Sequence, residues 1–152
     1  MKLLIRRLDP SATLPARQSK DAAGYDLCAC LREPVTLAPQ EIRRIPTGIA
    51  IELPKQTAGM VYPRSGLASK FGITLINCVG VIDCDYRGEL QVPVVNLSGK
   101  AFTISHGDRI AQLVVTPILT PETQEVDALS QTERGEGGFG STGITEGGHC
   151  FV

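Results

Sequence analysis

The sequence predicts an all-β domain built as a sandwich, a jelly roll or a barrel. Sixteen glycines and ten prolines are spread through the 152 residues and divide the chain into short segments. Turn signals recur about every ten residues, which is typical of all-β proteins with many short strands. The β-rich runs between these signals are Ile42 to Leu53, Gly59 to Tyr62, Glu89 to Leu97, Ala101 to Ile104 and Ile110 to Pro117.

The run from Glu89 to Asn96 shows the pattern of a half-buried strand. Leu90, Val92 and Val94 recur at every second position, so one face of the strand is expected to point into the core. Pro93 lies within this run and has no backbone N–H to donate. We therefore expect an edge or a bulge at Pro93.

One segment, 65–71, is expected to be a short helix. It contains no β-branched residue, Ser65 stands at its start as the expected N-cap, and Gly72 stands after its end. Serine favours the first position because its hydroxyl can accept a backbone N–H, and glycine favours the left-handed backbone that closes a helix.

Composition excludes several classes of partner. The formal net charge is -1 with 42% hydrophobic residues, so there is no basic excess for binding a nucleic acid polymer. The first apolar run ends at Ile5 before Arg6 and Arg7, which is too short for a signal peptide. No stretch is long enough to cross a bilayer. We expect no membrane partner and a cytoplasmic protein.

The five cysteines are expected to remain thiols in that compartment: Cys28, Cys30, Cys78, Cys84 and Cys150. Cys28-x-Cys30 could in principle bind zinc. No second pair of cysteines or histidines with ligand spacing accompanies it, which disfavours that alternative.

Pro63-Arg64-Ser65-Gly66 is a candidate anion site. It places an arginine and a glycine where the predicted helix begins, and the free N–H groups there attract negative charge. A guanidinium is a forked donor that suits phosphate. The alternative is an ordinary helix start with a surface arginine.

A second cluster, residues 80–89, is expected to form a long hairpin. Its turn carries Asp83, Asp85 and Tyr86, and a fixed carboxylate could take a proton from water. The alternative is that the two aspartates only bond their own backbone, as they commonly do in turns.

The tail from Thr132 is rich in glycine and should be mobile when nothing is bound. It has no Gly-Lys-Ser/Thr and is not a Walker loop. Phe139 could stack on a ring while Arg134 and Ser141 reach phosphates, which would make the tail a lid. The alternative is a disordered tail without a role.

Together these clusters resemble the homotrimeric dUTPase family. All five of that family's motifs are present in order: Ala23 to Leu27, Pro63 to Ile73, Gly80 to Gly88, Gly107 to Leu113 and Arg134 to Gly143. Any one motif could occur by chance, but five in sequence are highly specific. Cysteines at 28, 30, 78 and 84 depart from the residues expected in or beside the motifs, and Ile144–Val152 has no assigned role.

The resemblance implies a jelly-roll-like distorted barrel with one short helix and a C-terminal flexible arm. Residues 1–131 would form the β domain and residues 132–152 the arm. Three subunits would build shared active sites that hydrolyse dUTP to dUMP and pyrophosphate with Mg²⁺. That reaction keeps uracil out of DNA and supplies dUMP for thymidylate synthesis.

The resemblance also implies a role for each site residue. Asp83 would activate the attacking water, Tyr86 would lie under the deoxyribose, and Asp26 would contact the Mg²⁺ hydration shell. Asp108 would position an arginine. The uracil would be read by Asn77 and by the backbone of Val81, Ile82 and Gln91. The phosphates would be bound by Arg64, Ser65, Gly66 and Gln112, and the lid would use Arg134, Phe139, Gly140 and Ser141.

Two alternative functions fit the sequence less well. A dCTP deaminase can share this fold, but the placement of Asp83 and of the Phe139 segment argues against it. The zinc deaminases are excluded because H-x-E with P-C-x-x-C is missing. A non-catalytic binding module would not need Asp83, Arg64, Gln112 and Arg134 together.

Overall fold

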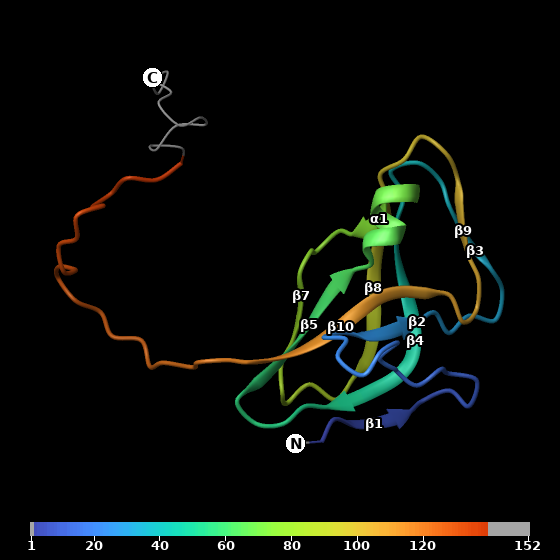
Figure 1. The fold of residues 1–152 in the computed structure, drawn as a ribbon, viewed down its shortest axis with the longest axis horizontal. Coiled ribbons are helices and arrows are strands. Elements are labelled where there is room, and N and C mark those ends of the chain that lie inside the picture. The colour runs from blue at the N-terminus through green and yellow to red at the C-terminus, as the bar shows by residue number, and fades with distance from the viewer. Residues whose placement is uncertain (1, 140–152) are drawn as a thin grey trace. The chain divides into compact units, whose positions relative to one another are not determined.

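The structure is a computed structural model that describes residues 2–139. The chain divides into two units, one ending at Thr120 and one beginning at Pro121. The first unit contains every helix and strand among the described residues (Figure 1).

Antiparallel strands build the first unit, which confirms the all-β prediction. One sheet has the order β1 (Leu4–Arg7), β4 (Ile42–Glu52), β8 (Glu89–Asn96) and β6 (Ile73–Leu75). A second sheet has the order β2 (Tyr25–Cys28), β10 (Arg109–Pro117), β5 (Thr57–Pro63) and β7 (Gly80–Ile82). A third contains only β3 (Val35–Leu37) and β9 (Phe102–Ile104).

The core forms as the alternation in β8 predicts. Leu90, Val92 and Val94 are at most 2% exposed and pack in one cluster with Ile45 and Leu113. Apolar surface buried in this way stabilises the fold by about 25 cal/mol per Å². Because these side chains fill the inner face, Glu89 and Gln91 must point to the opposite face of the sheet.

The expectation for Pro93 was only partly right. β8 lies between β4 and β6, so it is an interior strand. The ladder with β6, however, covers only Val94 to Asn96, and one further bond joins the Ile76 N–H to the Pro93 carbonyl. Pro93 therefore stands where β8 loses its neighbour, which is where a missing N–H costs least.

The helix α1 spans Ser65–Phe71, as predicted. Gly72 closes it with a left-handed φ of 68°, donating its N–H to Ala68 O and Leu67 O. The N-cap prediction was wrong, because the cap is Arg64 and no side chain caps the first turn. Ser65 is already helical, so its hydroxyl does not hold the cap position.

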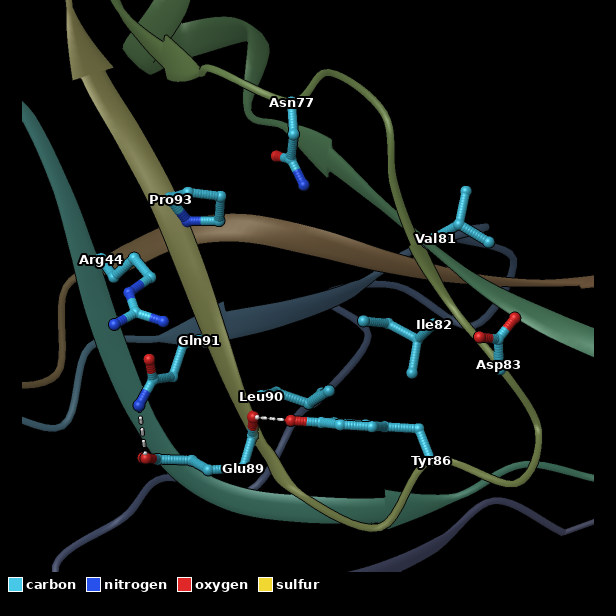
Figure 2. A pocket seen from close by; sticks show the side chains of 10 residues that line it. All are labelled: Arg44, Asn77, Val81, Ile82, Asp83, Tyr86, Glu89, Leu90, Gln91 and Pro93. Carbon is cyan, nitrogen blue, oxygen red and sulfur yellow. Dashed lines mark hydrogen bonds between the residues drawn. The ribbon is translucent and has the colours of Figure 1, made fainter.

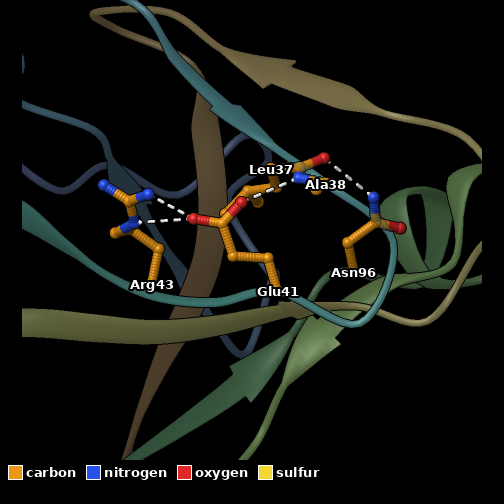
Figure 3. A network of polar contacts seen from close by, with 5 residues as sticks. All are labelled: Leu37, Ala38, Glu41, Arg43 and Asn96. Atoms are coloured by element: carbon orange, nitrogen blue, oxygen red, sulfur yellow. Dashed lines mark hydrogen bonds and ion pairs between the residues drawn. The ribbon is translucent and has the colours of Figure 1, made fainter.

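A buried amide ties the third sheet to the first (Figure 3). The Asn96 side chain is fully buried and donates to Leu37 O at 3.1 Å and Lys100 O at 2.8 Å. Nearby, the Glu41 carboxylate accepts the Ala38 N–H at 2.8 Å and pairs with Arg43. The hydrogen bond from Arg43 lowers the pKa of the Glu41 carboxyl, which favours its charged form.

The prediction of a hairpin over residues 80–89 was wrong. β7 pairs with β5 in the second sheet, whereas β8 pairs with β4 and β6 in the first. The segment with Asp83 and Tyr86 is thus a crossing between sheets. Over residues 2–139, no helix is long and apolar enough to span a bilayer.

Candidate active site

Two polar pockets on the β unit contain eleven of the residues that the sequence singled out: Asn77, Val81, Ile82, Asp83, Tyr86 and Gln91 in the first, and Asp26, Arg64, Ser65, Gly66 and Gln112 among the lining of the second. The first has a volume of about 530 Å³ and the second about 480 Å³, and no residue lines both. We call them the crossing pocket, after the segment from β7 to β8, and the helix-start pocket, after the beginning of α1.

The crossing pocket brings together six residues predicted from the sequence (Figure 2). They are Asn77, Val81, Ile82, Asp83, Tyr86 and Gln91. Sequence reasoning missed Arg44, Glu89, Leu90 and Pro93, which also line the pocket. Part of this set could have been found, because Glu89, Gln91 and Pro93 alternate with the core residues of β8 and share its outer face.

This pocket exists because the chain leaves the first sheet after β6. Residues after Leu75 diverge from β8 and cross to the second sheet, where Val61 pairs with Gly80 at the start of β7. A Cβ on Gly80 would lie 3.1 Å from the Asn77 amide nitrogen, so the glycine lets Asn77 lie close to the β7 backbone. The part of β8 before Pro93 keeps β4 as its ladder partner.

The crossing segment has a defined conformation. The Tyr86 N–H donates to Asp83 O at 3.1 Å, and Arg87 donates to the carbonyls of Cys84 at 2.8 Å and Tyr86 at 3.0 Å. Asp83 directly follows β7 and is exposed. Within residues 2–139, the carboxylates of Asp83 and Asp85 accept no hydrogen bond. The alternative that these aspartates only bond their own backbone is therefore wrong.

The helix-start pocket combines residues from three elements and the connection after β5. Asp26 comes from β2, Gln112 from β10, Arg64 follows β5, and Ser65 and Gly66 begin α1. Asp26 and Gln112 are cross-strand partners. The Gln112 amide donates to Pro63 O at 3.0 Å.

Two glycines, Gly24 and Gly66, line this pocket, and they differ in what surrounds them. A Cβ on Gly24 would lie 2.8 Å from the Gln112 side-chain oxygen, so only glycine leaves room for that amide. A Cβ on Gly66 would meet nothing within 4 Å. No contact with the described residues therefore requires a glycine at 66.

Asp26 forms ion pairs with two arginines at this pocket. One oxygen pairs with Arg64 Nε at 3.1 Å and the other with an Arg109 guanidinium nitrogen at 3.2 Å, while the carboxylate is only 12% exposed. Two guanidiniums around one carboxylate leave a net positive charge, to which Lys70 on α1 adds. This arrangement favours an anionic ligand.

Two residues near Asp26, Cys28 and Asp108, differ from it in their environment and partners. Burial, with the Asp26 charge, raises the pKa of the Cys28 thiol, and the four cysteines within residues 2–139 are all free. Asp108 was expected to position an arginine. Among the described residues Asp108 accepts the Ser105 N–H at 2.7 Å and forms no ion pair, whereas Asp26 pairs with Arg64 and Arg109, so the role of Asp108 stays a prediction.

The predicted lid residues fall in the second unit. Arg134 Nε donates to Gly137 O at 2.7 Å, closing a turn, and Phe139 is fully exposed. Gly140 and Ser141 lie outside the described residues.

An all-β domain that has a cationic pocket and a second pocket with an exposed carboxylate fits the class of proteins that bind phosphorylated ligands. A family model described as dUTPase matches residues 10–143. The chain belongs to the dUTPase family and is a dUTP diphosphatase, which hydrolyses dUTP to dUMP.

Curated relatives match this chain along nearly its whole length. The deoxyuridine 5'-triphosphate nucleotidohydrolase of Thermoanaerobacter sp. (strain X514) is 51% identical over 144 residues, covering 93% of this chain and 97% of the relative. That of Desulfitobacterium hafniense (strain DSM 10664 / DCB-2) is 49% identical, with 95% and 97% covered. Both names describe nucleotidohydrolases, which favours the diphosphatase over a deaminase.

Solved structures confirm the jelly-roll-like fold. A mutant of the Staphylococcus bacteriophage 80alpha dUTPase with dUpNHpp is 33% identical, with a TM-score of 0.86 over 94% of this chain and 99% of the other. A mutant dUTPase from phage phi11 of S. aureus, described with a structural Mg(II) ion, is 30% identical, with a TM-score of 0.79 over 86% and 100%.

Gly66→Ala should separate stability from substrate binding. Alanine is the better helix former by about 1 kcal/mol and meets no atom, so the free energy of unfolding should stay the same or rise. If a phosphate approaches the backbone here, kcat/KM for dUTP should fall by roughly tenfold. Denaturation and steady-state kinetics measure both effects.

Gly99→Ala is the matched control, because its Cβ also meets nothing within 4 Å and Gly99 lines neither pocket. Unchanged kcat/KM in Gly66→Ala would remove Gly66 from the phosphate site.

Proposed function

We propose that Asp83 is the general base of this dUTPase and that it activates the water that attacks the α-phosphorus of dUTP. The observation that carries the proposal is the exposed carboxylate of Asp83, free of hydrogen bonds within the described residues, in the same pocket as Asn77 and Tyr86. A base must reach a water while the nucleotide is held beside it.

The proposed step balances as a hydrolysis. Asp83 takes one proton from the water, and the water oxygen forms a bond to the α-phosphorus. The bond from that phosphorus to the α–β bridging oxygen breaks, and pyrophosphate leaves with the electron pair. The proton on Asp83 then passes to solvent, which the exposure of this side chain permits.

Recognition of uracil is assigned to the crossing pocket. The Asn77 amide and the backbone of Val81, Ile82 and Gln91 supply donors and acceptors from two facing strands of different sheets. A cytosine would leave buried polar groups unpaired, which binding sites discriminate strongly. Tyr86 lines the same pocket and would lie against the deoxyribose, where a 2′-hydroxyl would collide.

The phosphates are assigned to Arg64, Ser65, Gly66 and Gln112 in the helix-start pocket. Both Asp26 oxygens are engaged by arginines, and residues 2–139 hold no group of three His, Cys, Asp or Glu residues that could bind a metal directly. Such a pocket fits Mg²⁺ held by phosphate oxygens and water, with Asp26 contacting its hydration shell. Bound in this way, Mg²⁺ would neutralise phosphate charge.

We infer a homotrimer with shared active sites, because one chain separates the two pockets. β2, which carries Asp26, and β7 are the opposite edges of the second sheet. Three strand spacings of about 4.8 Å put these edges roughly 14 Å apart. A nucleotide with its base in the crossing pocket of one subunit could place its phosphates in the helix-start pocket of another.

The remaining assignments follow the same proposal. Residues 1–131 would form the trimer, and the arm 132–152 would close the site with Arg134, Phe139, Gly140 and Ser141. The enzyme would act in the cytoplasm, where it would keep uracil out of DNA and supply dUMP for thymidylate synthesis.

Asp83→Asn should bind a non-hydrolysable dUTP analogue with nearly normal Kd but turn over far more slowly. The amide keeps the shape of the side chain and cannot accept a proton, so kcat should fall by on the order of 10²–10⁴-fold. Asp85→Asn, two residues away and also exposed, is the matched control and should retain most of kcat. The reverse result would make Asp85 the base.

A chain that ends at Gln131 should remain folded but lose most activity. The arm contributes no residue to the hydrophobic core among the described residues, so the melting temperature should change little. Loss of the proposed stacking of Phe139 on the uracil would alone remove about 1–3 kcal/mol of binding free energy. Full-rate hydrolysis by the truncated protein would show that the arm is not a lid.

Phe139→Trp offers a direct signal for closure. The protein has no tryptophan, so fluorescence from position 139 would change when the analogue and Mg²⁺ bind.

A further inference from the structure

The position of the Tyr86 ring depends on the two residues that follow Arg87. The ring folds back over Gly88, where a Cβ would collide with the ring and its hydroxyl. The Tyr86 hydroxyl donates to the backbone carbonyl of Glu89 at 3.0 Å (Figure 2). The ring is therefore held by the backbone at 88–89, and its position is only as fixed as that backbone.

Glu89 is anchored through its own side chain. One carboxylate oxygen accepts the Gly48 N–H at 2.8 Å, and the other accepts the Gln91 amide at 3.1 Å. Glu89 is half-buried and lies between the crossing pocket and a smaller pocket lined by Gly48, Ser11 and Cys30. Both oxygens therefore accept hydrogen bonds from the protein.

On the β4 side, Gly48 lies in a bulge that a hydrogen bond holds in place. Pro46 pairs with Gln91 and Ala50 with Glu89, so β4 bulges over residues 47–49 opposite Leu90. Thr47 fixes the bulge by donating to Leu90 O at 2.6 Å.

Packing holds Gly48 itself. It is buried with a left-handed φ of 68°, and a Cβ there would lie 2.8 Å from Ala12 and from the Cys30 sulfur. A buried N–H that loses its acceptor carries a penalty, so the Gly48 N–H holds the carboxylate in place.

We propose that Glu89 is a positioning residue for discrimination against ribonucleotides. Its carboxylate, tied to Gly48, fixes the carbonyl that receives the Tyr86 hydroxyl, and so holds the ring where a 2′-hydroxyl would collide. This inference rests on the proposed role of Tyr86 at the sugar. Glu89 contacts none of the reacting atoms.

The test is the selectivity ratio, kcat/KM for dUTP divided by kcat/KM for UTP. Glu89→Ala removes the anchor, and the ratio should fall by on the order of tenfold through a rise in kcat/KM for UTP. Glu89→Gln keeps one oxygen for the Gly48 N–H and should retain the ratio. Glu33→Ala, an exposed carboxylate outside the pocket, is the matched control.

Tyr86→Ala separates the two hypotheses. It should lower the ratio, and Glu89→Ala should add little in the double variant because both act through one ring. A lowered ratio in Tyr86→Ala with an unchanged ratio in Glu89→Ala would overturn the inference alone. An unchanged ratio in Tyr86→Ala would overturn the role of Tyr86 as well.

A merely structural role for Glu89 would depress kcat/KM for both nucleotides equally and leave the ratio unchanged, which would also overturn the inference. If Glu89→Ala does not fold, Glu89→Asp serves instead. It keeps the charge, shortens the reach to Gly48 by one methylene, and should lower the ratio.

Discussion

The departure of the chain from the first sheet after β6 is the constraint on which the site depends. If the chain had continued alongside β8 beyond Ile76, β8 would be paired on both sides along its whole length. It crosses to pair with β5 instead, and so the crossing pocket opens between β7 and β8. Pro93 stands at the point of divergence, where its missing N–H is tolerated.

The helix-start pocket depends on a different interaction, the ion pairs of Asp26. Two arginines with like charge would repel each other at the end of β5 and the start of β10. The Asp26 carboxylate forms an ion pair with each of them and so holds them close together, while Gly24 leaves space for Gln112. A preorganised cationic pocket does not have to reorganise when an anion binds.

Much of the fold could be predicted from the sequence, because local signals agreed with the tertiary structure. The alternation in 89–96 and the Gly72 stop both rest on backbone geometry that a few residues determine. The hairpin prediction failed because turn residues report that the chain changes direction, and do not report which strand it pairs with next. The Ser65 prediction failed because Arg64 keeps the extended backbone of the chain leaving β5, with ψ of 129°, so the cap position falls one residue before the serine.

The site was predicted in part for the same reason. Asp83 and Arg64 lie in motifs that a resemblance can locate, and Asn77 lies just before one of them. Arg44 became visible only through its pairing with Pro93 across β4 and β8, which is long-range information. The separation of the residues into two pockets is likewise a property of the sheets, and it is the main physical argument for a shared active site.

Subunit complementation tests that claim most directly. Asp83→Asn damages the crossing pocket and Arg64→Ala the helix-start pocket, and the two variants can be co-expressed with different tags and purified as mixed assemblies. If each site takes its two pockets from different subunits, equal mixing restores about a quarter of the sites, one half times one half. Mixed assemblies no more active than the separate variants would place each complete site within a single chain and contradict the account.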